Sequence, residues 1–115
     1  MSDPRRELAQ VADGDGPAAA AARTALGDGA AATRLRAAIL ALSQHRGPQS
    51  SICPSDAARA VGGEGWRELN AESRSIALSL ARDGEVEITQ RGDAVDPNQS
   101  PRGPIRIRMT SAGGL

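Results

Sequence analysis

The strongest structural signal in the sequence is a helical pattern over residues 66–84 that leads directly into a strand pattern. In WRELNAESRSIALSLARDG, four residues recur at the spacing of one buried helix face: Leu69, Ser73, Ile76 and Leu80. Gly84 then supplies a left-handed stop. The following EVEITQ, and later GPIRIRM, alternate apolar and charged residues as half-buried strands do. A long helix followed by two such strands predicts an α+β domain with an antiparallel sheet.

The two strand patterns carry opposite charges. Antiparallel pairing would place Glu85 and Glu87 on one solvent face with Arg106 and Arg108, where opposite charges attract across the strands. The segment that joins them, RGDAVDPNQSPRGP, is long for a hairpin loop. We therefore expect this segment to be either functional or mobile.

Two further helices are predicted upstream of residue 66. Apolar residues at helical spacing predict one helix from about residue 34 to residue 45, ended by Gly47-Pro48. Ile52-Cys53 is typical of a short bridging strand, and Pro54 fits the first position of a helix over 54–62. This order of elements is the winged helix-turn-helix topology, with 54–62 and 66–83 as the paired helices.

We predict one small winged-helix domain at 34–109, with three helices and a two- to three-stranded antiparallel sheet. Residues 1–33 are rich in alanine and glycine and have little to bury, so we expect a flexible or transiently helical extension. Residues 110–115 are expected to form a disordered tail.

Composition excludes several classes of site. The net charge is zero, all 14 basic residues are arginines, and Trp66 is the one aromatic residue. One cysteine and one histidine cannot build a zinc site or an internal disulfide. No apolar run approaches the roughly 18 residues of a membrane span, and no secretory signal is evident. We expect a cytoplasmic protein that is not an enzyme and needs no cofactor or metal.

Four motifs resemble a known bacterial family. ICPSDAAR, GGEGWR, EITQRG and RGPIRIR occur in that order over about residues 34–109. Together they resemble the family catalogued as domain of unknown function three-two-five-three. The resemblance implies a winged-helix-like fold, and it implies no activity and no functional residues.

The helix over 66–83 and the long loop contain the candidate DNA-binding residues. A recognition helix presents arginine and amide side chains to the major groove, and arginines followed by glycine can approach a phosphate closely. The candidates are Arg67, Asn70 and Arg74 on the helix, and Arg91 and Arg102 in the loop. These residues predict a DNA-binding module, such as an auxiliary transcription regulator, with duplex DNA as its partner.

The alternative is a protein-interaction module that uses the same fold and never touches DNA. Residues 34–109 hold eleven arginines and nine acidic residues, a net charge of +2 that is small for a DNA-binding domain. Homodimerisation would double the basic surface, and Leu78, expected to be exposed, is one candidate contact. Trp66 is expected to be a core anchor. Cys53 and His45 are interpreted as structural residues, although the sequence alone leaves a Cys–His pair open.

Overall fold

The structure, a computed structural model, describes residues 3–110, and these form an α+β fold. Three helices come before the first strand-like segment: α1 (Pro4–Ala12), α2 (Pro17–Leu26) and α3 (Ala31–Arg46). After it come α4 (Pro54–Gly62) and α5 (Trp66–Arg82). The α+β class is thus confirmed. Helices α3, α4 and α5 correspond to the three helices predicted for 34–109, and α1 and α2 precede them in the segment where no stable helix was expected.

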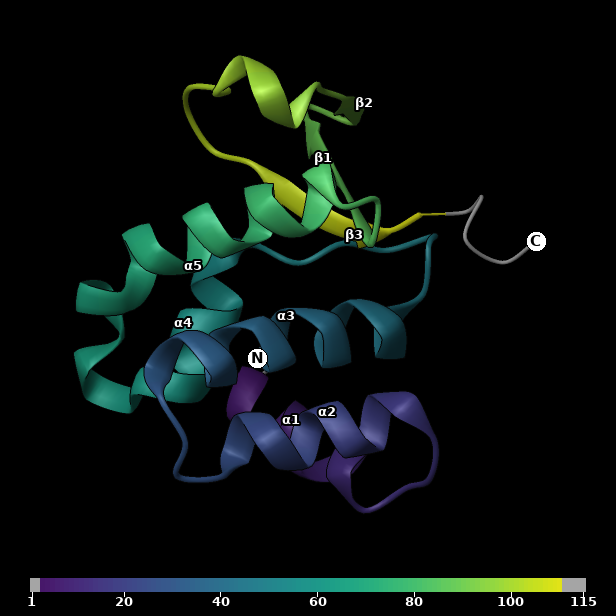
Figure 1. The fold of residues 1–115 in the computed structure, drawn as a ribbon. Coiled ribbons are helices and arrows are strands. Elements are labelled where there is room, and N and C mark those ends of the chain that lie inside the picture. The colour runs from purple at the N-terminus through teal and green to yellow at the C-terminus, as the bar shows by residue number, and fades with distance from the viewer. Residues whose placement is uncertain (1–2, 111–115) are drawn as a thin grey trace.

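Helix α3 lies across the middle of the molecule, with α1 and α2 on one side and α5 and the sheet on the other (Figure 1). Its buried residues are distributed around most of the helix: Leu35, Ala37, Ala38, Ile39, Ala41, Leu42 and Ser43. A helix that is apolar nearly all round needs cover on more than one side. This requirement explains why elements pack against α3 from both directions.

The expected flexible extension at residues 1–33 is wrong for residues 4–26. Leu8 of α1 is fully buried and Val11 nearly so, while α2 buries Ala19, Ala22 and Ala25. These alanines have little surface individually. Their small size lets α2 approach α3 closely, and both helices contribute to the same core as Leu35.

Polar contacts fasten α1 to the rest of the fold. Arg46, in the last turn of α3, forms a two-pronged ion pair with Glu7, at 2.8 Å from Nη2 to Oε1 and 3.1 Å from Nε to Oε2. The hydrogen bond to Glu7 raises the pKa of the Arg46 guanidinium above its usual range, against the opposing effect of burial. Arg5 also donates from Nη1 to the Ala60 carbonyl of α4 at 2.9 Å.

The two helices predicted at 54–62 and 66–83 are confirmed as α4 and α5. Ser73 in the middle of α5 is buried, and its Oγ donates to the Pro54 carbonyl at 2.7 Å. Leu80 is buried as predicted, and Leu69 and Ile76 pack partly buried against the core. Gly84 ends the helix region with φ 80°, the left-handed conformation expected there.

The sheet has three strands: β1 (Val86–Gln90), β2 (Asp93–Ala94) and β3 (Arg106–Met109), in the order β2-β1-β3. β1 pairs antiparallel with β3, and Ile52 forms the predicted single bridge, to Ile107, with two backbone hydrogen bonds of 2.8 Å. Of the predicted tail, residues 111–115 lie outside the described residues. No helix among residues 3–110 is long and apolar enough to cross a membrane.

The predicted charge pairing across the strands holds for one pair only. Glu87 stands opposite Arg108, whose Nε donates to the Glu87 carboxylate at 2.7 Å. Glu85 instead pairs with Arg36 of α3 at 2.8 Å. Arg106 stands opposite Thr89, so the strand register leaves it without an acidic partner across the strand.

The burial of α1 gives a direct stability prediction. Leu8→Ala should lower the free energy of unfolding by about 3 kcal/mol, because a fully buried leucine is replaced by a cavity. Urea unfolding measures the change. The exposed Gln10 on the same helix is the control, and Gln10→Ala should cost less than about 0.5 kcal/mol. Equal small effects of both substitutions would show that α1 is not part of the core.

Candidate nucleic-acid interface

The segment between β1 and β3 is ordered and folds back along α5. It contains β2 and a short 3-10 turn, Pro97–Gln99, and Val95 donates its backbone N–H to the Ile88 carbonyl at 2.9 Å. Contacts between this turn and α5 place the segment beside the second half of that helix. We call residues 91–105 the loop segment.

The loop segment begins with a tight turn at Arg91-Gly92. Both residues have positive φ, 53° for Arg91 and 86° for Gly92, and Gln90 pairs with Asp93 on either side. This is the two-residue hairpin geometry that favours asparagine and glycine. An arginine at the first position costs on the order of 1 kcal/mol in backbone strain. The turn leaves the Arg91 side chain exposed.

Arginines of α5 hold the loop segment in place. Arg74 donates from Nη1 to the Gly103 carbonyl at 2.7 Å and from Nη2 to the Pro101 carbonyl. Arg82, the last residue of α5, donates from Nη2 to the Pro97 carbonyl at 3.2 Å. Arg74 was predicted as a DNA contact on this helix. The partners of its guanidinium are instead backbone carbonyls that lie far along the chain, and the Arg74 side chain is half-buried.

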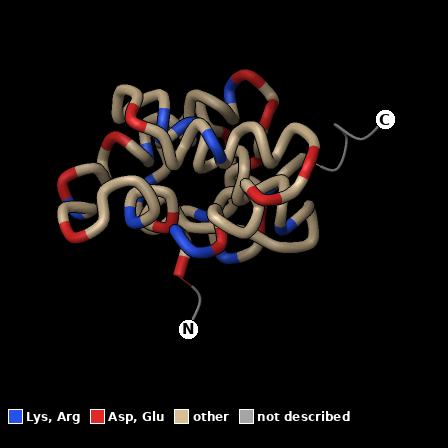
Figure 2. Tube along the Cα trace, turned by 90° about the horizontal axis from the view of Figure 1, so that it is seen from below, with Lys and Arg blue, Asp and Glu red and all other residues tan. Residues whose placement is uncertain are grey.

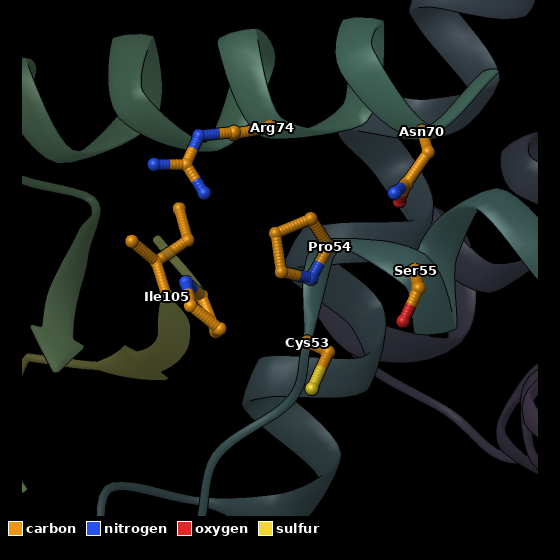
Figure 3. Close-up of a pocket in the computed structure, with 7 residues that line it drawn as sticks. Cys53, Pro54, Ser55, Asn70, Arg74 and Ile105 are labelled. Atoms are coloured by element: carbon orange, nitrogen blue, oxygen red, sulfur yellow. The ribbon is translucent and has the colours of Figure 1, made fainter. Parts of the chain in front are cut away.

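A pocket of about 280 Å³ opens where α4, α5 and the loop segment meet. Asn70 and Arg74 extend from α5 on one side, and the start of α4 faces them (Figure 3). The lining residues are Cys53, Pro54, Ser55, Asn70, Arg74, Pro104 and Ile105. Two of the predicted site residues therefore share one hollow, and none of the lining residues is acidic.

A second pocket, of about 520 Å³, continues from Pro104 along the loop segment. Its lining residues are Gln90, Arg91, Arg102, Gly103, Pro104 and Arg106. Arg91 and Arg102, both predicted from sequence, are thus brought together, and again no acidic residue lines the hollow. We call Arg91, Arg102 and Arg106 the arginine strip.

Arg106 is a site residue that the sequence reasoning missed. Its guanidinium donates to Ser51, at 2.9 Å to Oγ and 3.0 Å to the carbonyl, and to Cys53 Sγ at 2.7 Å. Within residues 3–110, no carboxylate forms an ion pair with this guanidinium. The alternating pattern suggested a pairing with glutamate, and only the strand register could have revealed otherwise.

Arg91 and Arg102 differ from most arginines of this chain. Within residues 3–110, neither side chain makes a hydrogen bond or ion pair, whereas nine other arginines bind a carbonyl, a carboxylate, a hydroxyl or a thiol. Acidic and basic residues are otherwise interspersed over the molecule (Figure 2). The strip is therefore a local positive feature on a chain with zero net charge.

Arg67 is the predicted site residue that the structure does not bring to the pockets. Its guanidinium carbon lies over the Trp66 ring, 4.7 Å from the centroid, and that of Arg59 lies at 4.6 Å. Trp66 is partly exposed and stacked by arginines, so its predicted role as a core anchor is wrong. The ring sits at the start of α5, beyond the buried stripe of that helix.

The structure also places Leu78, Cys53 and His45, for which the sequence suggested roles. Leu78 is partly buried and packs against the core, so it is not the exposed contact that was expected. Cys53 precedes α4 and lines the first pocket, where its sulfur contacts Arg106. Among the described residues, no hydrogen bond joins Cys53 to His45, which is exposed near the end of α3.

The role of Arg74 can be tested by hydrogen exchange. Arg74→Gln should speed amide exchange in residues 95–103 by about tenfold, because losing charge-assisted bonds to two carbonyls costs roughly 1.5 kcal/mol of local stability. Arg67→Gln, on the same helix but away from the loop segment, is the control and should leave these rates unchanged. Equal protection in both variants would contradict the assignment.

Relief of strain at Arg91 gives a second test. Arg91→Asn should raise the free energy of unfolding by about 0.5–1 kcal/mol, since asparagine tolerates positive φ better. Arg102→Asn is the control, because Arg102 does not have positive φ and should show no such gain. Chemical unfolding reports both values. A loss of stability in Arg91→Asn would mean that the arginine side chain itself stabilises the fold.

Comparison with known proteins agrees with the order of motifs in the sequence. A comparison with curated proteins gave no match. The family model described as a protein of unknown function, DUF3253, matches residues 32–110, which include α3, α4, α5 and the sheet. The match covers more than half of the chain and leaves α1 and α2 outside it. The chain therefore belongs to the DUF3253 family.

Proposed function

We propose that this protein is a winged-helix module that binds duplex DNA, with α4 and α5 as the helix-turn-helix pair and the loop segment as the wing. The observation that carries the proposal is the grouping of Arg91, Arg102 and Arg106 around one hollow. Among residues 3–110, Arg91 and Arg102 have no side-chain partner, and no acidic residue of this range lines the hollow. This hollow shares Pro104 with the pocket formed by Asn70 and Arg74. The two hollows together make an extended surface, which suits a linear polyanion.

The element order supports the winged-helix assignment. Helix α3, the bridge at Ile52, α4, α5, β1, the loop segment and β3 follow one another in the order of that fold. The bridge at Ile52 joins the edge of the sheet at β3, on the side away from β2. The DNA-binding surface of such a module combines the exposed face of the second paired helix with the wing.

Guanidinium groups in the arginine strip suit phosphate oxygens. Arginine offers several N–H donors in a planar fork and keeps its charge at all physiological pH values. Gly92 and Gly103, next to Arg91 and Arg102, have φ of 86° and 81° and carry no side chain that would keep a DNA backbone away. The strip is thus assigned to the phosphate backbone.

On α5, Asn70 is the residue assigned to base contact. It is exposed, and an asparagine side chain can bond adenine through two hydrogen bonds in the major groove. Glu72 lies about 160° around the helix from Arg74, at 100° per residue, so it projects on the flank away from the wing. Arg74 itself acts by fixing the wing beside Asn70.

The small net charge of +2 over residues 34–109 limits the expected affinity. Phosphate contacts from a few arginines give binding that falls steeply with salt, so we expect measurable binding only at low ionic strength for a single domain. A homodimer would double the basic surface that contacts DNA. Formation of a homodimer remains a prediction. The proposal places the protein in the cytoplasm, with the chromosome.

Neutralising the strip tests the proposal. The Arg91→Asn/Arg102→Gln double variant should bind a mixed-sequence duplex at least about tenfold more weakly at 50 mM salt, and the slope of log affinity against log salt should shrink by about 2. Fluorescence anisotropy of a labelled duplex measures both quantities.

A matched control variant removes two positive charges outside the arginine strip. Arg6 is exposed with no partner among residues 3–110, and Arg36 makes an exposed ion pair with Glu85, so Arg6→Gln/Arg36→Gln is the comparison. The control should lose less than about threefold in affinity. Absence of binding by the unmodified protein, or an equal loss in both variants, would rule out DNA binding through this surface.

A further inference from the structure

The start of α5 carries a second surface that the DNA proposal does not use. Trp66 is partly exposed, and the guanidinium carbons of Arg59 and Arg67 lie over its ring at 4.6 Å and 4.7 Å from the centroid. None of these three residues lines either pocket of the DNA surface. We call Arg59, Trp66 and Arg67 the tryptophan cluster.

The tryptophan cluster contains two guanidinium groups that are free to bind a ligand. Within residues 3–110, neither Arg59 nor Arg67 makes a hydrogen bond or ion pair, and both side chains are exposed. A guanidinium stacked on an aromatic ring is restrained by that ring, while its N–H groups stay available for an acceptor. Two such groups beside one ring form a preorganised receptor for carboxylate oxygens.

We propose that the tryptophan cluster is a docking surface for a protein partner that presents carboxylate side chains next to an apolar residue. The arginines take the carboxylates, and the exposed part of the Trp66 ring takes the apolar side chain. Tryptophan and arginine are the residue types that most often dominate binding energy at protein interfaces. This proposal does not depend on DNA binding.

The neighbouring charges favour a protein over DNA at this surface. Glu64 and Glu68 are exposed and lie within two residues of Trp66 in the chain, and no ion pair neutralises them among the described residues. A polyanion would be repelled by both glutamates. A protein surface with mixed charge can place a basic group near them while its carboxylates reach the arginines.

Trp66 is itself the reporter for the test, since it is the one aromatic residue of the chain. The probe is a capped peptide, acetyl-Lys-Glu-Leu-Glu-Gly-amide, titrated into the full chain at low salt; its lysine supplies the basic group that Glu64 and Glu68 require. Its control is the same peptide with glutamine in place of glutamate. The acidic peptide should change Trp66 emission in a saturable way, with affinity at least about tenfold above that of the glutamine peptide.

Variants then assign the effect to the cluster. Arg59→Gln/Arg67→Gln should weaken acidic-peptide binding at least about tenfold by calorimetry, and Arg6→Gln/Arg36→Gln should leave it within about threefold. Equal responses to the two peptides, no response, or equal losses in both variants would overturn the proposal. A duplex DNA that changes Trp66 emission, with the change abolished in the Arg59→Gln/Arg67→Gln variant, would also overturn it by assigning the cluster to DNA.

Discussion

The enclosure of α3 is the constraint on which the rest of the structure depends. Leu35, Ile39 and Leu42 need apolar cover, and so do Ala37 and Ala41 on other sides of the helix. In a chain without phenylalanine or tyrosine, no single large side chain can fill such a space. Several small helices approach closely instead: α1 and α2 lie on one side of α3, and α5 and the sheet lie on the other (Figure 1). Helix α4 contacts α1 as well as α5. The loop segment therefore extends from a scaffold that is packed on both sides of its central helix.

Arginine contacts with backbone carbonyls organise the segments around this scaffold. Arg34 bonds the Ala25 carbonyl near the end of α2, and Arg23 bonds the Gly14 carbonyl after α1. Arg74 and Arg82 bond carbonyls of the loop segment in the same way. Carbonyls at helix ends and in loops lack partners in regular structure, and a guanidinium fork can satisfy two of them. The arginines that the fold does not use in this way then become the candidates for ligand binding.

Local sequence patterns predicted the second half of the chain well. The helices at 54–62 and 66–82, the strands and the bridge at Ile52 each follow from spacing, glycine stops or alternation within a short window. The stable packing of the N-terminal helices was missed because α2 buries only alanines and α1 buries few large apolar residues, so neither gives a clear buried stripe by itself. The available signal was in α3, whose apolar residues occupy more sides than one neighbouring layer can cover.

The candidate site could be predicted only in part, because side-chain partners lie far apart in sequence. Arg91 and Arg102 were found from their glycine neighbours, and the fold brings them together. Arg74 was predicted as a DNA contact, whereas its guanidinium binds two carbonyls of the loop segment. Arg106 was predicted to face a glutamate across the strands, whereas the register places it opposite Thr89. Stacking of Trp66 with Arg59 depends on the angle between two helices, which no local pattern contains.

Nuclear magnetic resonance mapping of a mixed-sequence duplex on the labelled protein tests the central claim most directly. If the wing and the exposed face of α5 form the DNA surface, amide shifts should cluster at residues 70–74, 89–92 and 102–106 and disappear as salt is raised. Residues 4–26 should show no shifts, since α1 and α2 lie on the other side of α3. Shifts centred on α1 and α2, or none at any duplex concentration at low salt, would contradict the account.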